Sequence, residues 1–292
     1  DLLSERVSAG ERLGDAELTE LARTPDILPI GMLADAARRR LSGTRVTYLR
    51  VASRPCDQAI TDAVPPAARE VRITGAPASL DAALTAISRT KAAAGDRTVA
   101  GFSWGDVVRL TTSEDVTAVA VLSALHSAGL DALLEVPIDM VGQVETVLDC
   151  LCGAGFRQIR LTVERAQATE RTALMLRAAA LQERYRCIQT LSPLPSVLQP
   201  FRPTTGYDDV RAVAVARLAA PNIPMIQVDW LRYGPKLAQV ALTFGADDLD
   251  TAPGADDAPD GLRRAPIEEL RRNIVAAGLT PAERDGHFTL IA

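Results

Sequence analysis

The sequence predicts a (β/α) barrel of the TIM type, preceded by a helical extension. Short apolar runs typical of strands alternate with longer amphipathic runs typical of helices, in units of about 25–30 residues. About seven or eight such units favour a closed barrel over an open sheet. The chain has 292 residues, of which 47% are hydrophobic, so it can bury a large core.

The expected elements follow from periodicity and from the positions of glycine and proline. Helices are expected at residues 2–9, 15–23, 30–41, 79–94, 113–128, 141–154, 169–184, 207–218, 235–244 and 266–277. Strands are expected at residues 45–51, 70–74, 98–102, 132–136, 158–163, 187–191 and 224–229, with a candidate edge strand at 288–291. Residues 52–69 contain three prolines and are interpreted as loop or short helix, so the first strand–helix unit looks shortened.

This pattern predicts a single domain. Residues 1–44 form the N-terminal helices, 45–250 the barrel core, 251–265 a loop, and 266–292 a C-terminal helix and tail. We see no close internal repeat in the sequence.

Charge and hydropathy exclude some classes of partner. The formal net charge is −5 and both signs are spread along the chain, so no coherent basic face for nucleic acid is predicted. Apolar runs fall short of the roughly 20 residues of a membrane span, and residues 1–30 lack a signal-peptide pattern. We therefore expect a soluble cytoplasmic protein that binds neither nucleic acid nor membrane.

The cysteines and histidines do not predict a metal site. Four cysteines in a chain of this length do not make a disulfide framework. Cys150 and Cys152 lie two apart on a predicted helix and point in different directions, which makes a shared metal ion improbable. The two histidines, His126 and His287, are far apart and have no assignable catalytic partner.

Residues 222–250 carry the most specific signal in the chain. Together with residues 31–40, 70–75, 128–131 and 281–285, they resemble aminofutalosine synthase and its relatives in the radical S-adenosylmethionine (radical SAM) family. The resemblance implies a TIM-type barrel of the radical SAM kind. It also implies a [4Fe–4S] cluster held by three cysteines at C-x-x-x-C-x-x-C spacing, and SAM bound beside it.

The chain departs from this family where the cofactors bind. About twenty residues join Val51 to Glu70, and Cys56 is the only thiol among them; one thiolate does not hold a four-iron cluster. Where the resemblance implies paired glycines near the SAM amine, the chain has Gly75-Ala76. We therefore expect a degenerate member without the cluster, and SAM binding has little support.

Candidate binding residues are expected at the carboxyl ends of the strands, where barrels of this type place their ligands. They are Gly75, Trp104, Glu135, Gln227 and Asp229. Several carboxylates facing one mouth suit acid–base chemistry if burial raises a pKa. The alternative interpretation is that they are solvated strand ends and helix caps.

Three further candidates lie outside the strands. Gln199 and Arg202 belong to a proline-rich crossover, where a stiffened guanidinium suits a carboxylate or phosphate, or anchors the crossover. Lys236 follows Gly234-Pro235 at a predicted helix start, which attracts anions. No catalytic residue and no metal ligand is assigned.

Three functions remain open. The first is a binding or accessory protein in futalosine-dependent menaquinone biosynthesis, holding a pathway intermediate. The second is a non-radical enzyme acting on a nucleoside or aromatic carboxylate at the barrel mouth. The third is a structural subunit that pairs with an intact paralogue. A shortened first unit would leave a strand edge to be covered, so a homodimer or such a complex is expected.

Overall fold

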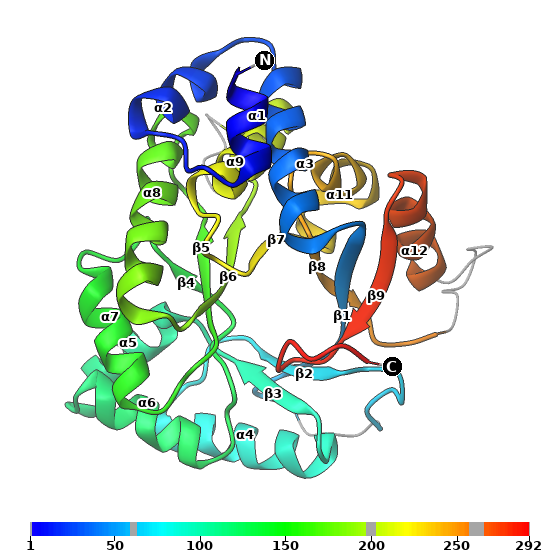
Figure 1. Ribbon diagram of the computed structural model, residues 1–292. Helices are drawn as coiled ribbons and strands as arrows, with labels where there is room; N and C mark the ends of the chain where they lie inside the picture. The colour runs from blue at the N-terminus through cyan, green and yellow to red at the C-terminus, as the bar shows by residue number, and fades with distance from the viewer. Residues whose placement is uncertain (1, 59–62, 197–202, 257–265, 292) are drawn as a thin grey trace.

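The computed structural model describes residues 2–58, 63–196, 203–256 and 266–291. Its strands are β1 (Arg45–Pro55), β2 (Glu70–Thr74), β3 (Thr98–Gly101), β4 (Val136–Pro137), β5 (Ile159–Val163), β6 (Ile188–Pro193), β7 (Met225–Asp229), β8 (Asp248–Pro253) and β9 (Thr280–Arg284). Parallel pairing in the order β3-β2-β1-β8-β7-β6-β5-β4 curls the sheet, as Figure 1 shows. The predicted barrel of the TIM type is confirmed.

Helices alternate with the strands and cover the outer face of the sheet (Figure 1). They are α1 (Leu2–Ala9), α2 (Asp15–Arg23), α3 (Leu28–Ser42), α4 (Leu80–Ala94), α5 (Trp104–Glu114), α6 (Ala118–Ser127), α7 (Val144–Gly153), α8 (Ala168–Tyr185), α9 (Gly206–Ala219), α10 (Trp230–Tyr233), α11 (Pro235–Leu242) and α12 (Pro266–Ala276). The N-terminal helices pack on the outside, α1 against α3 and α3 against α9. Within the described ranges, no helix is both long enough and apolar enough to cross a bilayer.

Backbone contacts link the two strands at the ends of this order, β3 and β4. Isolated parallel bridges join Ala100 to Ala132 and Ser103 to Glu135. The amide of Trp104 donates to the carbonyl of Glu135 at 3.1 Å, and this bond continues the same seam. The seam therefore brings the start of α5 next to the start of β4.

The first strand is longer than the sequence analysis predicted. Strand β1 runs on to Pro55, and its last five residues pair with β2. Its first five residues pair with β9 along the same side, while β8 pairs on the other side. The predicted end at residue 51 was wrong because proline is tolerated at a strand end, where no ladder hydrogen bond is required of it.

The last strand also differs from prediction. The edge strand was expected at 288–291, but β9 lies at Thr280–Arg284 and contains Pro281. Among the described strands β9 pairs only with β1, and on its other side an isolated antiparallel bridge joins Arg284, at its end, to Leu290. A proline near the start of such an edge strand is tolerated.

The predicted helix at 113–128 is two helices, α5 and α6. The residue that ends α5, Asp115, has a left-handed backbone with φ 51°. Ser103 caps α5: its Oγ accepts from the Asp106 amide, and the Asp106 carboxylate accepts from the Ser103 amide. This capping box starts a helix nine residues before the predicted one.

Buried ion pairs fill the barrel interior near the amino ends of the strands, which we call the base network. Glu70 is fully buried and accepts two bonds from Arg160, at 2.9 and 2.5 Å, and one from Arg72 at 2.7 Å. Arg72 also donates to Asp250 at 2.6 Å. From β9, Arg284 makes a two-bond pair with Asp248 at 2.6 and 2.7 Å.

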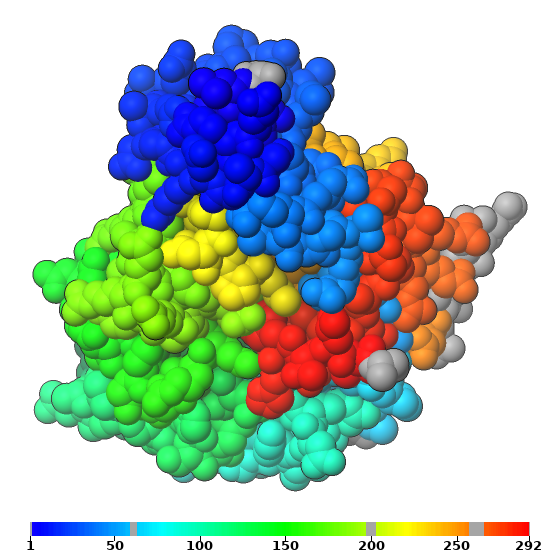
Figure 2. Space-filling model, in the orientation of Figure 1, coloured from blue at the N-terminus to red at the C-terminus, as the bar shows by residue number. Residues whose placement is uncertain are grey.

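The C-terminal residues cover this network. The Phe288 ring lies 4.2 Å from the guanidinium carbon of Arg284. Gly286 is packed so closely that a Cβ there would lie 1.8 Å from the Thr98 hydroxyl. Figure 2 shows the C-terminal residues, in red, filling the centre of that face. The base of the barrel is closed by the chain itself.

Candidate functional site

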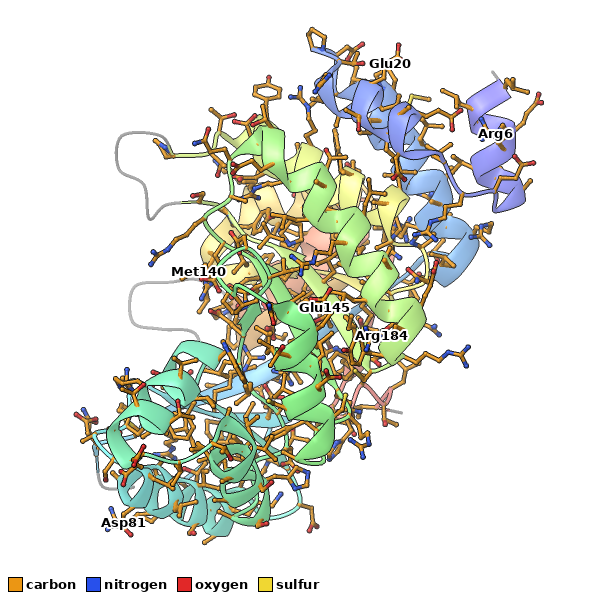
Figure 3. The ribbon with its side chains drawn as sticks, turned by 90° about the vertical axis from the view of Figure 1, so that its left-hand side faces the viewer. Arg6, Glu20, Asp81, Met140, Glu145 and Arg184 are labelled. Carbon is orange, nitrogen blue, oxygen red and sulfur yellow. The ribbon has the colours of Figure 1, made fainter. Side chains whose placement is uncertain are left out.

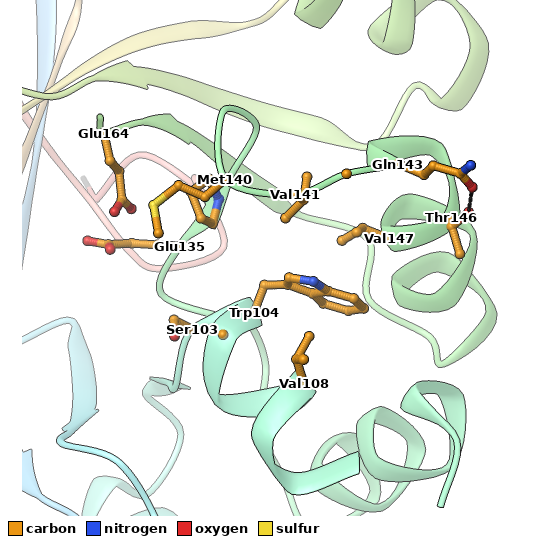
Figure 4. Close-up of a pocket in the computed structure, with 13 residues that line it drawn as sticks. Ser103, Trp104, Val108, Glu135, Met140, Val141, Gln143, Thr146, Val147 and Glu164 are labelled. Carbon is orange, nitrogen blue, oxygen red and sulfur yellow. Dashed lines mark hydrogen bonds between the residues drawn. The ribbon is translucent and has the colours of Figure 1, made fainter. Parts of the chain in front are cut away.

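A pocket of 560 Å³ lies at the mouth of the barrel, between the starts of α5 and α7. One wall is apolar and includes Trp104, Val108 and Val147. Glu135 and Glu164 lie at the opposite end, as Figure 4 shows, with Met140 beside them. The pocket thus offers a flat hydrophobic wall and two carboxylates, a combination typical of small-molecule sites.

Trp104 owes its place to the capping of α5. It is the first residue of that helix, directly after the cap Ser103. The backbone hydrogen bond from its amide to the carbonyl of Glu135 fixes it against the residue that precedes β4. Two residues predicted from separate strand ends therefore line the same pocket.

Glu135 is the carboxylate with the strongest perturbation at the mouth. Burial raises the pKa of Glu135 to about 7, opposed by the charge of Arg232 and reinforced by the neighbouring Glu164. Arg232 donates a short hydrogen bond to the Glu135 carboxylate. A carboxyl that titrates near neutrality, held beside a second carboxylate, is suited to donating or accepting a proton.

Glu164 is positioned by its own loop. The Thr162 hydroxyl donates to the Glu164 carboxylate at 3.0 Å. The backbone amides of Glu164, Arg165 and Ala166 all donate to the carboxylate of Asp139, at 2.6 to 3.1 Å. This anchoring fixes the end of β5 and limits how far Glu164 moves from Glu135.

Asp229 holds Arg232 in place from the far side. As the N-cap of α10 it accepts from the amides of Leu231 and Arg232, each at 2.9 Å, and from the Thr251 hydroxyl at 2.8 Å. Burial raises the pKa of Asp229, and the nearby Asp250 charge adds to the effect. Asp229 therefore lies at the predicted mouth and positions the arginine that pairs with Glu135.

The other predicted site residues lie elsewhere. Gly75 ends β2 with φ 84°, and a Cβ built there would lie 3.5 Å from the sulfur of Cys56. Gln227 does not reach the mouth: it is buried and donates to Asp248 at 2.7 Å, in the base network. Lys236 is exposed on the first turn of α11. Gln199 and Arg202 fall outside the described residues.

Sequence reasoning did not single out Arg232, which donates to the Glu135 carboxylate at the mouth. It follows the cap Asp229 by three residues, so its place depends on the single helical turn of α10. An Asp cap at a strand end is the one local signal for that turn. The partner across the mouth, Glu135, is 97 residues away, and nothing local predicts that pairing.

The cysteines do not suit an iron–sulfur cluster. Cys56 lies just beyond β1, Cys150 and Cys152 lie on α7, and Cys187 precedes β6. In the part of the chain that the structure describes, no three His, Cys, Asp or Glu side chains gather so as to hold a metal ion. A four-iron cluster needs mostly thiolate ligands, so these residues do not fit one.

Comparison with known proteins connects the C-terminal third to one family. Residues 193–290 match the family model described as the CofH/MqnC C-terminal region. The aminodeoxyfutalosine synthase of Thermus thermophilus is 41% identical over 93 residues, which are 29% of this chain and 24% of that protein. A 5-amino-6-(D-ribitylamino)uracil–L-tyrosine 4-hydroxyphenyl transferase of Archaeoglobus fulgidus is 27% identical over 220 residues, 65% of this chain and 64% of that one.

Solved structures resemble the chain over nearly its whole length. Methylornithine synthase aligns with a TM-score of 0.66 at 14% identity, covering 96% of this chain and 97% of that one. The FeFe-hydrogenase maturase HydG from Carboxydothermus hydrogenoformans aligns with a TM-score of 0.68 at 11% identity, covering 96% and 78%. At such identities the likeness is one of fold. In sequence, the match spans 24% of the length of the Thermus thermophilus relative and 64% of the length of the Archaeoglobus fulgidus relative.

Proposed function

We propose that this chain, which belongs to the aminofutalosine synthase-like radical SAM family, binds a small molecule at the barrel mouth without an iron–sulfur cluster. In this proposal it is a binding or accessory protein of the futalosine route to menaquinone. The observation that supports the proposal is that the barrel mouth has a pocket but lacks the thiols that a cluster needs. A pocket of 560 Å³ persists between α5 and α7, while Cys56 is the only thiol between β1 and β2.

The pocket favours a ligand that joins a flat ring to polar groups. An aromatic ring against Trp104 gains from stacking as well as from burial, worth about 0.5–1.5 kcal/mol beyond the area term. Glu135 and Glu164 accept hydrogen bonds from N–H or O–H groups at the other end. Nucleosides combine both features. The relatives' name supplies a probe of this kind, aminodeoxyfutalosine.

The test is calorimetric titration of the full chain with aminodeoxyfutalosine, followed by analysis of the mixture for products. The proposal expects saturable binding and recovery of the compound unchanged. Trp104→Ala should weaken binding about tenfold, equivalent to about 1.4 kcal/mol. Val119→Ala, an exposed valine on α6, is the matched control and should leave the affinity unchanged. Absence of binding, or equal affinity in both variants, would overturn the proposal.

One observation favours a second candidate, a non-radical enzyme that uses Glu135. A carboxyl whose pKa lies at about 7 is tuned for general acid–base catalysis. On this alternative the titrated compound would be consumed, and the reaction would survive anaerobic removal of iron with a chelator. Glu135→Gln would abolish turnover but preserve binding. Unchanged compound after prolonged incubation counts against this candidate.

A further inference from the structure

Two cysteines lie in contact away from the mouth. Cys152 is near the C-terminal end of α7, and Cys187 immediately precedes β6. Their sulfur atoms are 3.4 Å apart. A disulfide bond measures about 2.05 Å, so an approach of little more than about one ångström would allow the bond to form.

The backbones that carry the two sulfurs are fixed. The Cys187 carbonyl accepts from the Ile159 amide at 2.9 Å, at the start of the β5–β6 pairing. The Cys152 carbonyl accepts from the Arg157 guanidinium at 2.7 Å. Helix α7 is further held to α8, where Arg177 pairs with Glu145 at 2.9 Å; Figure 3 shows the face that carries both helices. The sulfur contact thus joins two anchored elements.

The two thiols differ in access. Cys187 is 8% exposed, and burial raises the pKa of its thiol to about 12, with the Cys152 thiol contributing. Cys152 is only partly buried. A small oxidant in solution therefore meets Cys152 first, and Cys187 lies within reach of the product.

We propose that Cys152 and Cys187 form a reversible intramolecular disulfide when the chain meets a low-molecular-weight disulfide. The Cys152 thiolate attacks one sulfur of the oxidant, forms a mixed disulfide and releases one small thiol. The Cys187 thiol loses its proton to solvent, and its sulfur attacks that of Cys152, releasing the second small thiol. Two protein thiols are oxidised and one small disulfide is reduced to two thiols.

The helix that carries Cys152 also lines the pocket. The first turns of α7 contribute Thr146 and Val147 to the pocket, and Cys152 lies near the other end of the same helix. Linking α7 to the start of β6 closes a loop around β5 and α8, which restricts the unfolded chain. The oxidised chain should therefore melt at a higher temperature than the reduced chain.

The test treats the full chain with oxidised glutathione, blocks the remaining thiols and maps peptides without reduction. We expect free thiols to fall from four to two, with one linked peptide pair containing residues 152 and 187. Dithiothreitol should restore all the thiols and lower the melting temperature again. Cys150→Ser, two residues away on the same helix, is the matched control and should form the same bond.

Cys152→Ser and Cys187→Ser should each abolish the linked pair and the rise in melting temperature. Alkylating Cys152 in the native wild-type chain before oxidation should do the same, which guards against a variant that misfolds. Persistence of four free thiols, or a linked pair that contains Cys56 or Cys150, would overturn the proposal. Neither result bears on the ligand at the mouth.

Discussion

At the base of the barrel, Glu70 is fully buried and forms ion pairs with both Arg160 and Arg72. At the mouth, by contrast, Glu135 forms an ion pair with one exposed arginine, Arg232, and has the carboxylate of Glu164 beside it. Burial alone would raise the pKa of both. In Glu70 the two guanidinium charges outweigh burial and lower the pKa to about 2, but in Glu135 burial prevails and the pKa is about 7. The same side chain is a structural anion at one end and a titratable group at the other.

This difference separates stability from function within one barrel. Carboxylates of the base network are matched by arginines and covered by the C-terminal residues, so their charge is fixed. The carboxylates at the mouth, Glu135 and Glu164, line a pocket in which they can accept hydrogen bonds from a ligand. Substitutions at the base should therefore affect folding, and those at the mouth should affect binding.

The largest expected effect is at Arg160. Arg160→Leu leaves the buried Glu70 with Arg72 alone, and we expect the free energy of unfolding to fall by about 3–5 kcal/mol. Urea unfolding measures it. Arg177→Leu removes a partly exposed ion pair with Glu145 and is the matched control, with a loss below about 1 kcal/mol. Equal losses would abolish the distinction between buried and surface pairs.

The pH dependence of stability follows from Glu70. Because its folded pKa is lowered from 4.5 to about 2, its stabilising contribution is complete above pH 4.5 and disappears as the pH falls towards 2. Urea midpoints measured across that window should decline steeply. A chain in which Glu70 and Arg160 are both replaced by leucine should decline less over the same range, and a parallel decline would contradict this account.

A smaller loss is expected at Gly286. Gly286→Ala places a methyl group against the Thr98 hydroxyl and the Glu70 carboxylate. We expect about 1–3 kcal/mol of destabilisation as the C-terminal residues shift. Hydrogen exchange should show the loss concentrated in β9. Gly142→Ala, in open space at the mouth, serves as control and should leave β9 protected.

Ser103→Ala tests the cap that places Trp104. Loss of a helix cap costs about 1 kcal/mol, seen as a slightly lower melting temperature. We also expect weaker ligand binding, since the Trp104 wall depends on this turn. Thr117→Ala removes the equivalent cap of α6 and should lower stability without affecting binding.

The smallest effect on stability is expected at Glu135. Its raised pKa means that ionisation of the folded chain is disfavoured, so Glu135 contributes less stability as the pH rises from 4.5 to about 7. Glu135→Gln should therefore be at least as stable as the parent at neutral pH, within about 1 kcal/mol. Chemical unfolding at pH 5 and pH 8 checks this. A large loss in the free energy of unfolding would mean that Glu135 stabilises the fold, as the carboxylates of the base network do.

The alternation of strand-like and helix-like runs, together with the positions of glycine and proline between them, was sufficient to predict the barrel. Long-range pairing was not predictable from the sequence. The strand β9, which pairs with β1, was not expected, and Gln227 was assigned to the mouth although its partner is Asp248 at the base. The α5 helix was missed although the Ser103–Asp106 capping box is a local signal. Trp104, Glu135 and Asp229 were placed at the mouth because strand ends converge there.

Arg232 shows the limit of sequence reasoning at this site. An arginine on a single helical turn gives no periodic signal, and its pairing with Glu135 depends on how β4 and β7 are arranged around the barrel. Charge pairs across a closed sheet are set by the tertiary fold.

The central claim is that the mouth works without a cluster, and one measurement tests it most directly. After anaerobic purification and reconstitution with iron and sulfide, iron and acid-labile sulfide are quantified per chain. The account predicts neither above the level of a chain in which Cys56 is replaced by serine. Four irons and four sulfides per chain would contradict it.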